Sequence, residues 1–178
     1  MPQAIWTIGH STRDWDAFAA LLGRHGIEAL ADVRRYAASR KHPQFNAAAM
    51  QEQLARSGIE YAAFPGLGGR RPARPDSPNT AWRNASFRGY ADHMASAEFR
   101  DALDALLALV ARKRTAIMCA EAVWWQCHRG LIADELKSRG IEVLHITDAA
   151  APKPHPYTGA ARIVDGRLSY AGSQPRLL

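Results

Sequence analysis

The sequence has few cysteines and no long hydrophobic run, and both absences narrow the class of protein. Only 2 of its 178 residues are cysteine, and the amino-terminal residues lack the basic-then-apolar pattern of a secretory signal peptide. These features argue against a disulfide-rich secreted scaffold and favour a cytoplasmic protein with reduced thiols. No apolar run approaches the roughly 18 residues needed to cross a bilayer, so we expect no membrane as a partner.

A third absence concerns cofactors. No G-x-G-x-x-G fingerprint follows the first predicted strand, at residues 4–10, which argues against redox chemistry with a bound dinucleotide.

The composition suits one globular domain, because 47% of the residues are hydrophobic, enough for a full core. A net charge of +6 favours an anionic small molecule or nucleic acid as partner, although the same charge also serves solubility.

Short apolar runs alternate with segments of helical periodicity along the chain. We predict strands at residues 4–10, 27–34, 59–64, 116–119 and 141–147, with helices between them. The triplet Gly-Ile-Glu occurs three times, at residues 26–28, 58–60 and 140–142, where a helix gives way to a strand. The pattern predicts a three-layer, Rossmann-like α/β fold, with a mostly parallel five-stranded sheet and helices on both faces.

Residues 1–178 are expected to form a single domain with two irregular parts. Residues 65–86, rich in glycine, proline and arginine, form a lid, a binding loop or a disordered segment. Residues 150–178 form a C-terminal tail that includes a hairpin around Asp165–Gly166. Ser11 to Asp14 resembles a capping box, and Ser96 and Asn46 are expected to cap later helices.

Ligands of an open α/β sheet bind beyond the carboxyl ends of the strands. Each predicted strand reaches that edge with polar, ionisable or flexible residues. They are Gly9, His10 and Ser11; Asp32 and Arg34; Gly68 and Gly69; Cys119 and Glu121; and Thr147 and Asp148. The sequence therefore predicts one site at this edge of the sheet.

The segment Cys127-His128-Arg129 opens a helix, where free N–H groups and the helix dipole favour an anion. A thiolate would be stabilised there, so Cys127 is a candidate nucleophile, ligand or hydrogen-bond partner, or else a small core residue. Cys119 ends a buried strand and is expected in the core.

His10, Asp32 and Glu121 are candidates for acid/base or electrostatic roles. For Glu121, a salt bridge to Arg34 or Arg129 is the commoner outcome. Asp32 and Arg34 point to the same side of a strand, so they either pair or flank a ligand. The predicted anion-binding residues are Gly9, Ser11, Arg34, Gly68, Gly69, His128 and Arg129.

Three further groups have competing interpretations. Trp124 and Trp125 are candidates to stack a base, to anchor a partner or to cover the apolar wall of the site. The role of covering the apolar wall is favoured. A basic rim either faces phosphate or is only solvated; it comprises Arg40, Lys41, Arg70, Arg71 and Arg74. Zinc-type ligands are present but poorly spaced, so a metal is not favoured and the cofactor is left open; they are His10, Cys119, Cys127 and His128.

Several of these segments together resemble the family catalogued as domain of unknown function 488, over about residues 5–148. The matching motifs are T-I-G-H-S at 7–11, D-V-R at 32–34, P-Q-F at 43–45, L-G-G at 67–69, F-R-G-Y-A at 87–91, M-C-A-E at 118–121 and C-H-R at 127–129. The resemblance implies a compact α/β domain and marks the same residues as the site. It implies little about the reaction.

The leading hypothesis is a hydrolase or group transferase that acts on an anionic nucleotide-like or nucleic-acid substrate. The alternatives are a nucleic-acid-binding module without catalysis and a metal- or thiol-based sensor. Loss of turnover in Glu121→Gln and Cys127→Ser would favour the enzyme.

Overall fold

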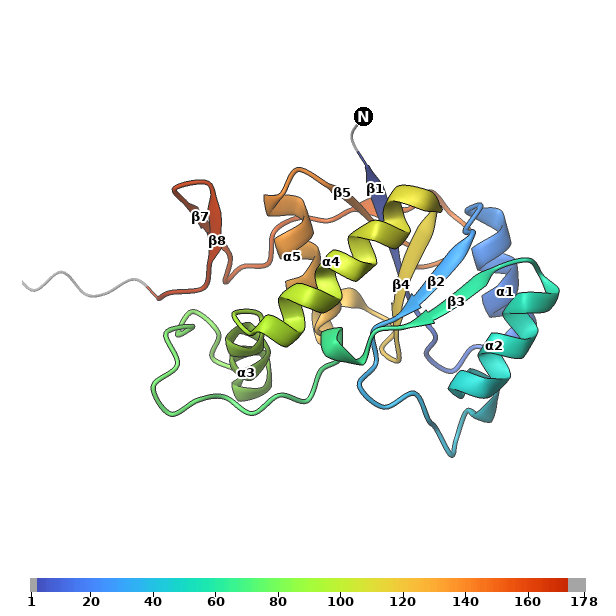
Figure 1. The fold of residues 1–178 in the computed structure, drawn as a ribbon, viewed down its shortest axis with the longest axis horizontal. Helices are drawn as coiled ribbons and strands as arrows, with labels where there is room; N and C mark the ends of the chain where they lie inside the picture. The colour runs from blue at the N-terminus through green and yellow to red at the C-terminus, as the bar shows by residue number, and fades with distance from the viewer. Residues whose placement is uncertain (1–2, 173–178) are drawn as a thin grey trace, which may run out of the picture.

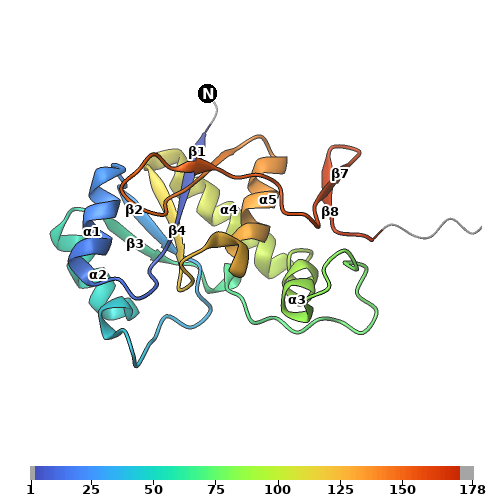
Figure 2. The same ribbon diagram turned by 180° about the vertical axis from the view of Figure 1, so that it is seen from behind.

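The computed structural model describes residues 3–172, and its elements alternate as the sequence predicts (Figures 1 and 2). In chain order they are β1 (Ala4–Gly9), α1 (Trp15–Arg24), β2 (Ala29–Asp32), η1 (Pro43–Phe45), α2 (Ala47–Arg56), β3 (Glu60–Ala63), η2 (Pro65–Leu67), α3 (Ala85–His93), α4 (Ala97–Arg112), β4 (Thr115–Cys119), η3 (Trp124–Gln126), α5 (Arg129–Ser138), β5 (Glu142–His145), β6 (Lys153–Pro154), β7 (Arg162–Val164) and β8 (Arg167–Ser169), the η elements being short 3₁₀ helices.

The strands form one sheet in the order β3-β2-β4-β1-β5-β6. The first five are parallel, which confirms the predicted parallel sheet. The antiparallel sixth strand was not predicted, because Pro152, Pro154 and Pro156 indicate a loop. Pro154 is compatible with β6 because this strand lies at the edge of the sheet, where proline is tolerated.

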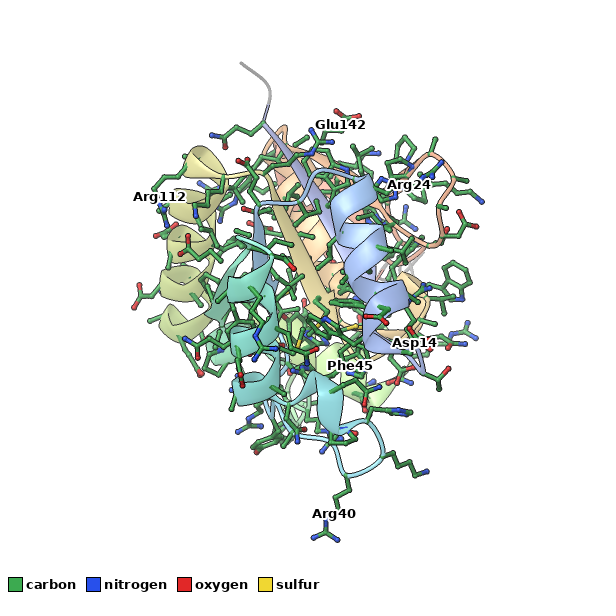
Figure 3. All side chains as sticks on the ribbon, turned by 90° about the vertical axis from the view of Figure 1, so that its right-hand side faces the viewer. Asp14, Arg24, Arg40, Phe45, Arg112 and Glu142 are labelled. Atoms are coloured by element: carbon green, nitrogen blue, oxygen red, sulfur yellow. The ribbon has the colours of Figure 1, made fainter. Side chains whose placement is uncertain are left out.

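Helices cover both faces of the sheet. Figure 3 shows α1 and α2 on one side of the strands and α4 on the other. Neighbouring strand residues face opposite layers, as the two-residue period of a strand requires. Ile5 packs in the layer that contains Leu103 of α4, whereas Trp6 packs in the layer that contains Phe18 of α1 and Leu54 of α2.

Two local predictions are confirmed by backbone angles, and one is wrong. Gly26, Gly58 and Gly140 all have positive φ, so each Gly-Ile-Glu triplet begins with the expected left-handed residue. Asp165 and Gly166 also have positive φ, as a type I′ hairpin turn requires. The capping box at residues 11–14 does not form; Asp14 itself caps α1 by accepting a hydrogen bond from the Ala17 N–H.

The long loop at residues 65–86 is fixed against α3 and α4. Asp92 of α3 accepts hydrogen bonds from the Arg74 N–H, Ser77 and Asn79. Arg71 pairs with Glu98 of α4. None of the helices within residues 3–172 is both long and apolar enough to span a membrane.

Candidate functional site

A cavity of about 620 Å³ lies where β1 and β4 end side by side. The chain leaves β1 toward α1 on one face and leaves β4 toward α5 on the other, so these neighbours form a topological switch point, the usual ligand site of such sheets. Most of the predicted site residues line it: His10, Ser11, Arg34, Gly69, Glu121, Cys127 and His128.

The cavity is positively charged. Among residues 3–172, three arginines contribute to its lining, and Glu121 is the only carboxylate that does so. The arginines are Arg34, Arg35 and Arg70. Arg35 donates a hydrogen bond to the Arg70 carbonyl, which fixes the rim formed by the start of the long loop. This charge distribution favours an anionic ligand.

The Cys127 sulfur contacts a candidate base, His128, and lies near groups that stabilise its thiolate. It lies 3.5 Å from His128 Nδ1 and accepts the Arg129 backbone N–H, also at 3.5 Å. Burial acts to raise the pKa of Cys127, but the neighbouring Cys119 thiol and the charge of Arg129 outweigh it and lower the pKa. Burial and the neighbouring Cys127 raise the pKa of Cys119 well above its ordinary value. Cys119, expected in the core, is buried and also lines the cavity.

The orientation of His128 makes it a candidate base for Cys127. Its Nε2 lies 2.7 Å from the Val33 carbonyl, which can only accept, so Nε2 carries the hydrogen. Burial lowers the pKa of His128, which keeps the ring neutral and leaves a lone pair on Nδ1 toward the sulfur. A thiol with an oriented imidazole is the usual arrangement of a cysteine nucleophile.

Arg129, predicted to bind an anion, does not line the cavity and is only 1% exposed. Its guanidinium donates to the Glu121 carbonyl at 2.7 Å and to Thr7 Oγ1 at 3.2 Å. Within residues 3–172 it contacts no carboxylate, and its Nε has no hydrogen-bond partner. A buried cation without a neighbouring anion favours a thiolate at Cys127.

Asp32 and Arg34 pair with each other, one of the two outcomes predicted. Arg34 donates to both Asp32 oxygens, at 2.9 and 2.7 Å, and Tyr61 donates a further hydrogen bond to Asp32. Asp32 is 1% exposed and does not line the cavity, whereas Arg34 does. The structure thus places the carboxylate behind Arg34, where it holds the guanidinium at the cavity wall.

His10 stacks on Phe45 with ring centroids 4.3 Å apart. Its Nδ1 donates to the Ser11 carbonyl, and its Nε2 lies 3.4 Å from Arg34. Burial, with the charge of Arg34, lowers the pKa of His10. His10 is therefore a neutral ring in the cavity wall, on the Arg34 side.

The predicted salt bridge of Glu121 is wrong. Its side chain is exposed and forms no ion pair among the described residues, because Asp32 already occupies Arg34 and only the Glu121 main chain reaches Arg129. The carboxylate stays free at the cavity mouth.

The predicted glycines differ in their roles. A Cβ on Gly9 would lie 1.7 Å from the Glu121 carbonyl oxygen, and one on Gly68 would meet the Arg35 backbone at 2.4 Å, so both allow close chain packing. Gly69 lies beside His128, where a Cβ would come within 3.0 Å of Nδ1.

Two residues other than glycine line the cavity with a left-handed backbone. Ser11 has a φ of 50°, and Arg70 has a φ of 59°. Such backbone strain is often found at functional sites.

The predicted basic rim is only partly assembled. Arg70 lines the cavity, but Arg71 and Arg74 are paired with Glu98 and Asp76. Arg40 lies at the tip of its loop and points away from the body of the molecule (Figure 3).

Cys127 also lines a second cavity of about 210 Å³ with an aromatic wall. Trp124 is stacked on His145, with ring centroids 4.8 Å apart, whereas Trp125 is 57% exposed. The aromatic lining consists of Trp82, Phe87, Trp124, Trp125 and Tyr157. Among residues 3–172, no group of three or more His, Cys, Asp or Glu side chains could hold a metal ion.

Sequence reasoning missed the contact between Thr7 and His145, which pair across β1 and β5 at 2.6 Å. A polar residue inside each of two apolar strands was the available signal. It was not decisive, because the strand order was unknown.

The comparisons with known proteins identify a family and no activity. No curated protein and no solved structure matches the chain. The family described as Domain of unknown function DUF488 matches residues 14–136, which span more than half of the chain. The match includes α1 to α4, most of α5, and the Cys119, Cys127 and His128 wall of the cavity. The chain therefore belongs to the DUF488 family.

Proposed function

We propose that the protein is an enzyme that hydrolyses or transfers a group of an anionic, nucleotide-like substrate, with Cys127 as its nucleophile. The observation that carries the proposal is the Cys127 sulfur, 3.5 Å from the lone pair of His128 Nδ1 in a cavity lined by arginines. A nucleophile needs an oriented base, and an anionic substrate needs positive charge nearby.

The first step begins with transfer of the Cys127 thiol proton to His128 Nδ1. The sulfur electron pair forms a bond to the electrophilic atom of the substrate, and the bond to the leaving group breaks with its electrons going to that group. The leaving group then takes the proton from His128. In the second step, water or an acceptor hydroxyl gives its proton to His128 while its oxygen bonds to the same substrate atom; the electrons of the sulfur bond return to Cys127, which is reprotonated.

The two cavities that share Cys127 support a nucleotide-like substrate. Arg35 and Arg70 line the larger cavity and suit a phosphate group. The aromatic side chains of the smaller cavity suit a planar base. A substrate that occupies both would place the bond between its two parts beside the sulfur.

Protection from alkylation tests this proposal. We expect adenosine 5′-monophosphate to slow the labelling of Cys127 by iodoacetamide, with the labelled position assigned by tandem mass spectrometry. Arg70→Met should weaken the protection, whereas Arg139→Met, which removes a surface arginine paired with Glu135, should not. Labelling of Cys127 no faster than that of Cys119, or equal with and without the nucleotide, would contradict the proposal.

The adjacent thiols favour a thiol-based sensor as a second candidate. Cys119 and Cys127 line the same cavity and each shifts the pKa of the other, so oxidation by a peroxide would convert both thiols into one disulfide while hydrogen peroxide is reduced to two waters. Peroxide treatment should then lower the intact mass by two hydrogens. An unchanged mass, or oxidation of Cys127 to sulfinic acid without a disulfide, would exclude this role.

A further inference from the structure

A chain of buried hydrogen bonds runs from Arg129, which follows His128 at the start of α5, to the carboxylate of Asp134 in the same helix. Arg129 donates to Thr7 Oγ1 at 3.2 Å, and Thr7 Oγ1 lies 2.6 Å from His145 Nδ1. His145 Nε2 lies 2.8 Å from His155 Nδ1, and His155 Nε2 lies 2.8 Å from Asp134 Oδ1. All five side chains are buried. We call this set the Thr7–Asp134 relay.

The chemistry of its two ends gives the relay a direction. An arginine can only donate and an ionised carboxylate can only accept. In the arrangement in which each ring carries one hydrogen, every hydrogen points from Arg129 through Thr7, His145 and His155 to Asp134. Burial is the main cause that lowers the pKa of His145 to about 3, which keeps this ring neutral.

The far end of the relay is anchored by the C-terminal segment. Asp134 accepts hydrogen bonds from the Thr158 hydroxyl at 2.6 Å and from the Tyr170 hydroxyl at 2.7 Å. The Thr158 N–H adds a third at 2.9 Å. His145, His155, Thr158 and Tyr170 all lie beyond residue 136, where the DUF488 match ends.

The relay connects Arg129 to a negative charge that it does not touch. A buried guanidinium without a counter-ion is costly and tends to reorient toward water or an anion. Thr7 accepts a hydrogen bond from one N–H of the guanidinium. Asp134 accepts the last hydrogen bond of the relay, from His155, and is joined to Thr7 through the rings of His155 and His145. The cation is thereby held in place without a carboxylate that would compete for it at the Cys127 sulfur.

We propose that the Thr7–Asp134 relay is a positioning device, through which the segment from His145 to Tyr170 fixes Arg129 against Cys127 and sets the reactivity of that thiol. The inference rests on the proposed role of Cys127 as nucleophile. The five residues of the relay line neither cavity, although Trp124 of the smaller cavity stacks on His145. They act on Cys127 through Arg129.

The test compares two matched substitutions of buried threonines. Thr7→Val removes the hydroxyl that links Arg129 to His145. Thr115→Val makes the same change on the neighbouring strand β4, where the hydroxyl donates only to the Lys113 carbonyl. The pH profile of Cys127 alkylation by iodoacetamide reports the thiol directly. The other groups that influence this thiol are Cys119, His128 and Tyr90, and both variants leave them intact.

We expect Thr7→Val to shift the Cys127 profile to higher pH and to slow labelling at neutral pH by about threefold to tenfold, the effect of one lost hydrogen bond. Thr115→Val should leave the profile unchanged, and Thr7→Ser, which keeps the hydroxyl, should restore it. Tyr170→Phe is a milder change at the Asp134 end of the relay. It should shift the Cys127 profile to higher pH by a smaller amount than Thr7→Val, and it tests the relay if Thr7→Val does not fold.

A Cys127 profile that is the same in wild type, Thr7→Val and Tyr170→Phe would overturn the relay, even if both variants were less stable. That result differs from failure of the proposed function, which would appear in the wild type as a Cys127 no more reactive than Cys119.

Discussion

Each of the two walls of the cavity has a buried arginine, and the two arginines differ in whether a carboxylate neutralises them. On the Asp32 wall, which His10 and Arg34 form with Asp32 behind them, the guanidinium is paired with a carboxylate at 2.7 Å. On the Cys127 wall, which Cys119, Cys127 and His128 form with Arg129 behind them, the guanidinium contacts only neutral oxygens among the described residues. The first cation is neutralised and supports the fold, whereas the second remains available to stabilise an anion. The difference indicates that the chemistry belongs to the Cys127 wall.

The largest expected effect is on stability, at the Asp32 wall. Arg34→Met would leave the Asp32 carboxylate buried without its cation and should lower the free energy of unfolding by about 3–5 kcal/mol. Urea unfolding measures the loss. The rate of Cys127 alkylation in the folded variant should stay close to wild type, and a large change in that rate would break the comparison between the walls.

At the Cys127 wall the expected effect is on reactivity. Arg129→Met removes the charge that lowers the pKa of Cys127, so iodoacetamide labelling at neutral pH should fall by about tenfold for each unit by which that pKa rises. The loss of stability should be smaller than for Arg34→Met, about 1–3 kcal/mol, since only uncharged oxygens lose a donor. An unchanged labelling rate would show that Arg129 is as structural as Arg34.

His145, in the relay behind the Cys127 wall, should make the free energy of unfolding depend on pH in the acid range. His145 has a folded-state pKa of about 3, whereas in the unfolded chain it titrates near 6.5. Between these values the unfolded state binds more protons, so stability rises with pH, by up to about 1.4 kcal/mol per unit for this group. Urea unfolding across this window should give a shallower slope for His145→Gln than for wild type. Equal slopes would mean that His145 is not held neutral.

The smallest expected effect is at Glu121, which lies at the mouth between the walls. Because its side chain is exposed and unpaired among the described residues, Glu121→Gln should change the free energy of unfolding by no more than about 0.5 kcal/mol. Cys127 labelling should change little as well. A strong effect of Glu121→Gln on labelling would instead support the acid/base role considered from the sequence.

The strands, the helices and the convergence of most candidate residues could be predicted from sequence because each depends on local signals. The Gly-Ile-Glu triplets mark three junctions, and polar residues follow each apolar strand. The edge strand β6 could not be predicted, since its partner is known only once β5 is placed at the side of the sheet.

The hydrogen-bond and ion-pair partners of individual side chains were harder to predict from the sequence. The pairing of Asp32 with Arg34 was one of two open outcomes, because the spacing on a strand does not show whether a ligand lies between them. The contacts of Thr7 with His145 and of Asp134 with His155 depend on strand order and on the path of the C-terminal segment. Neither follows from periodicity.

The most direct measurement is the pH dependence of alkylation at each of the two cysteines of the wild-type protein. The account predicts that Cys127 is labelled with a midpoint below the ordinary cysteine pKa, while Cys119 resists labelling until well above it. Two thiols that titrate alike, or a Cys127 midpoint at or above the ordinary value, would contradict it.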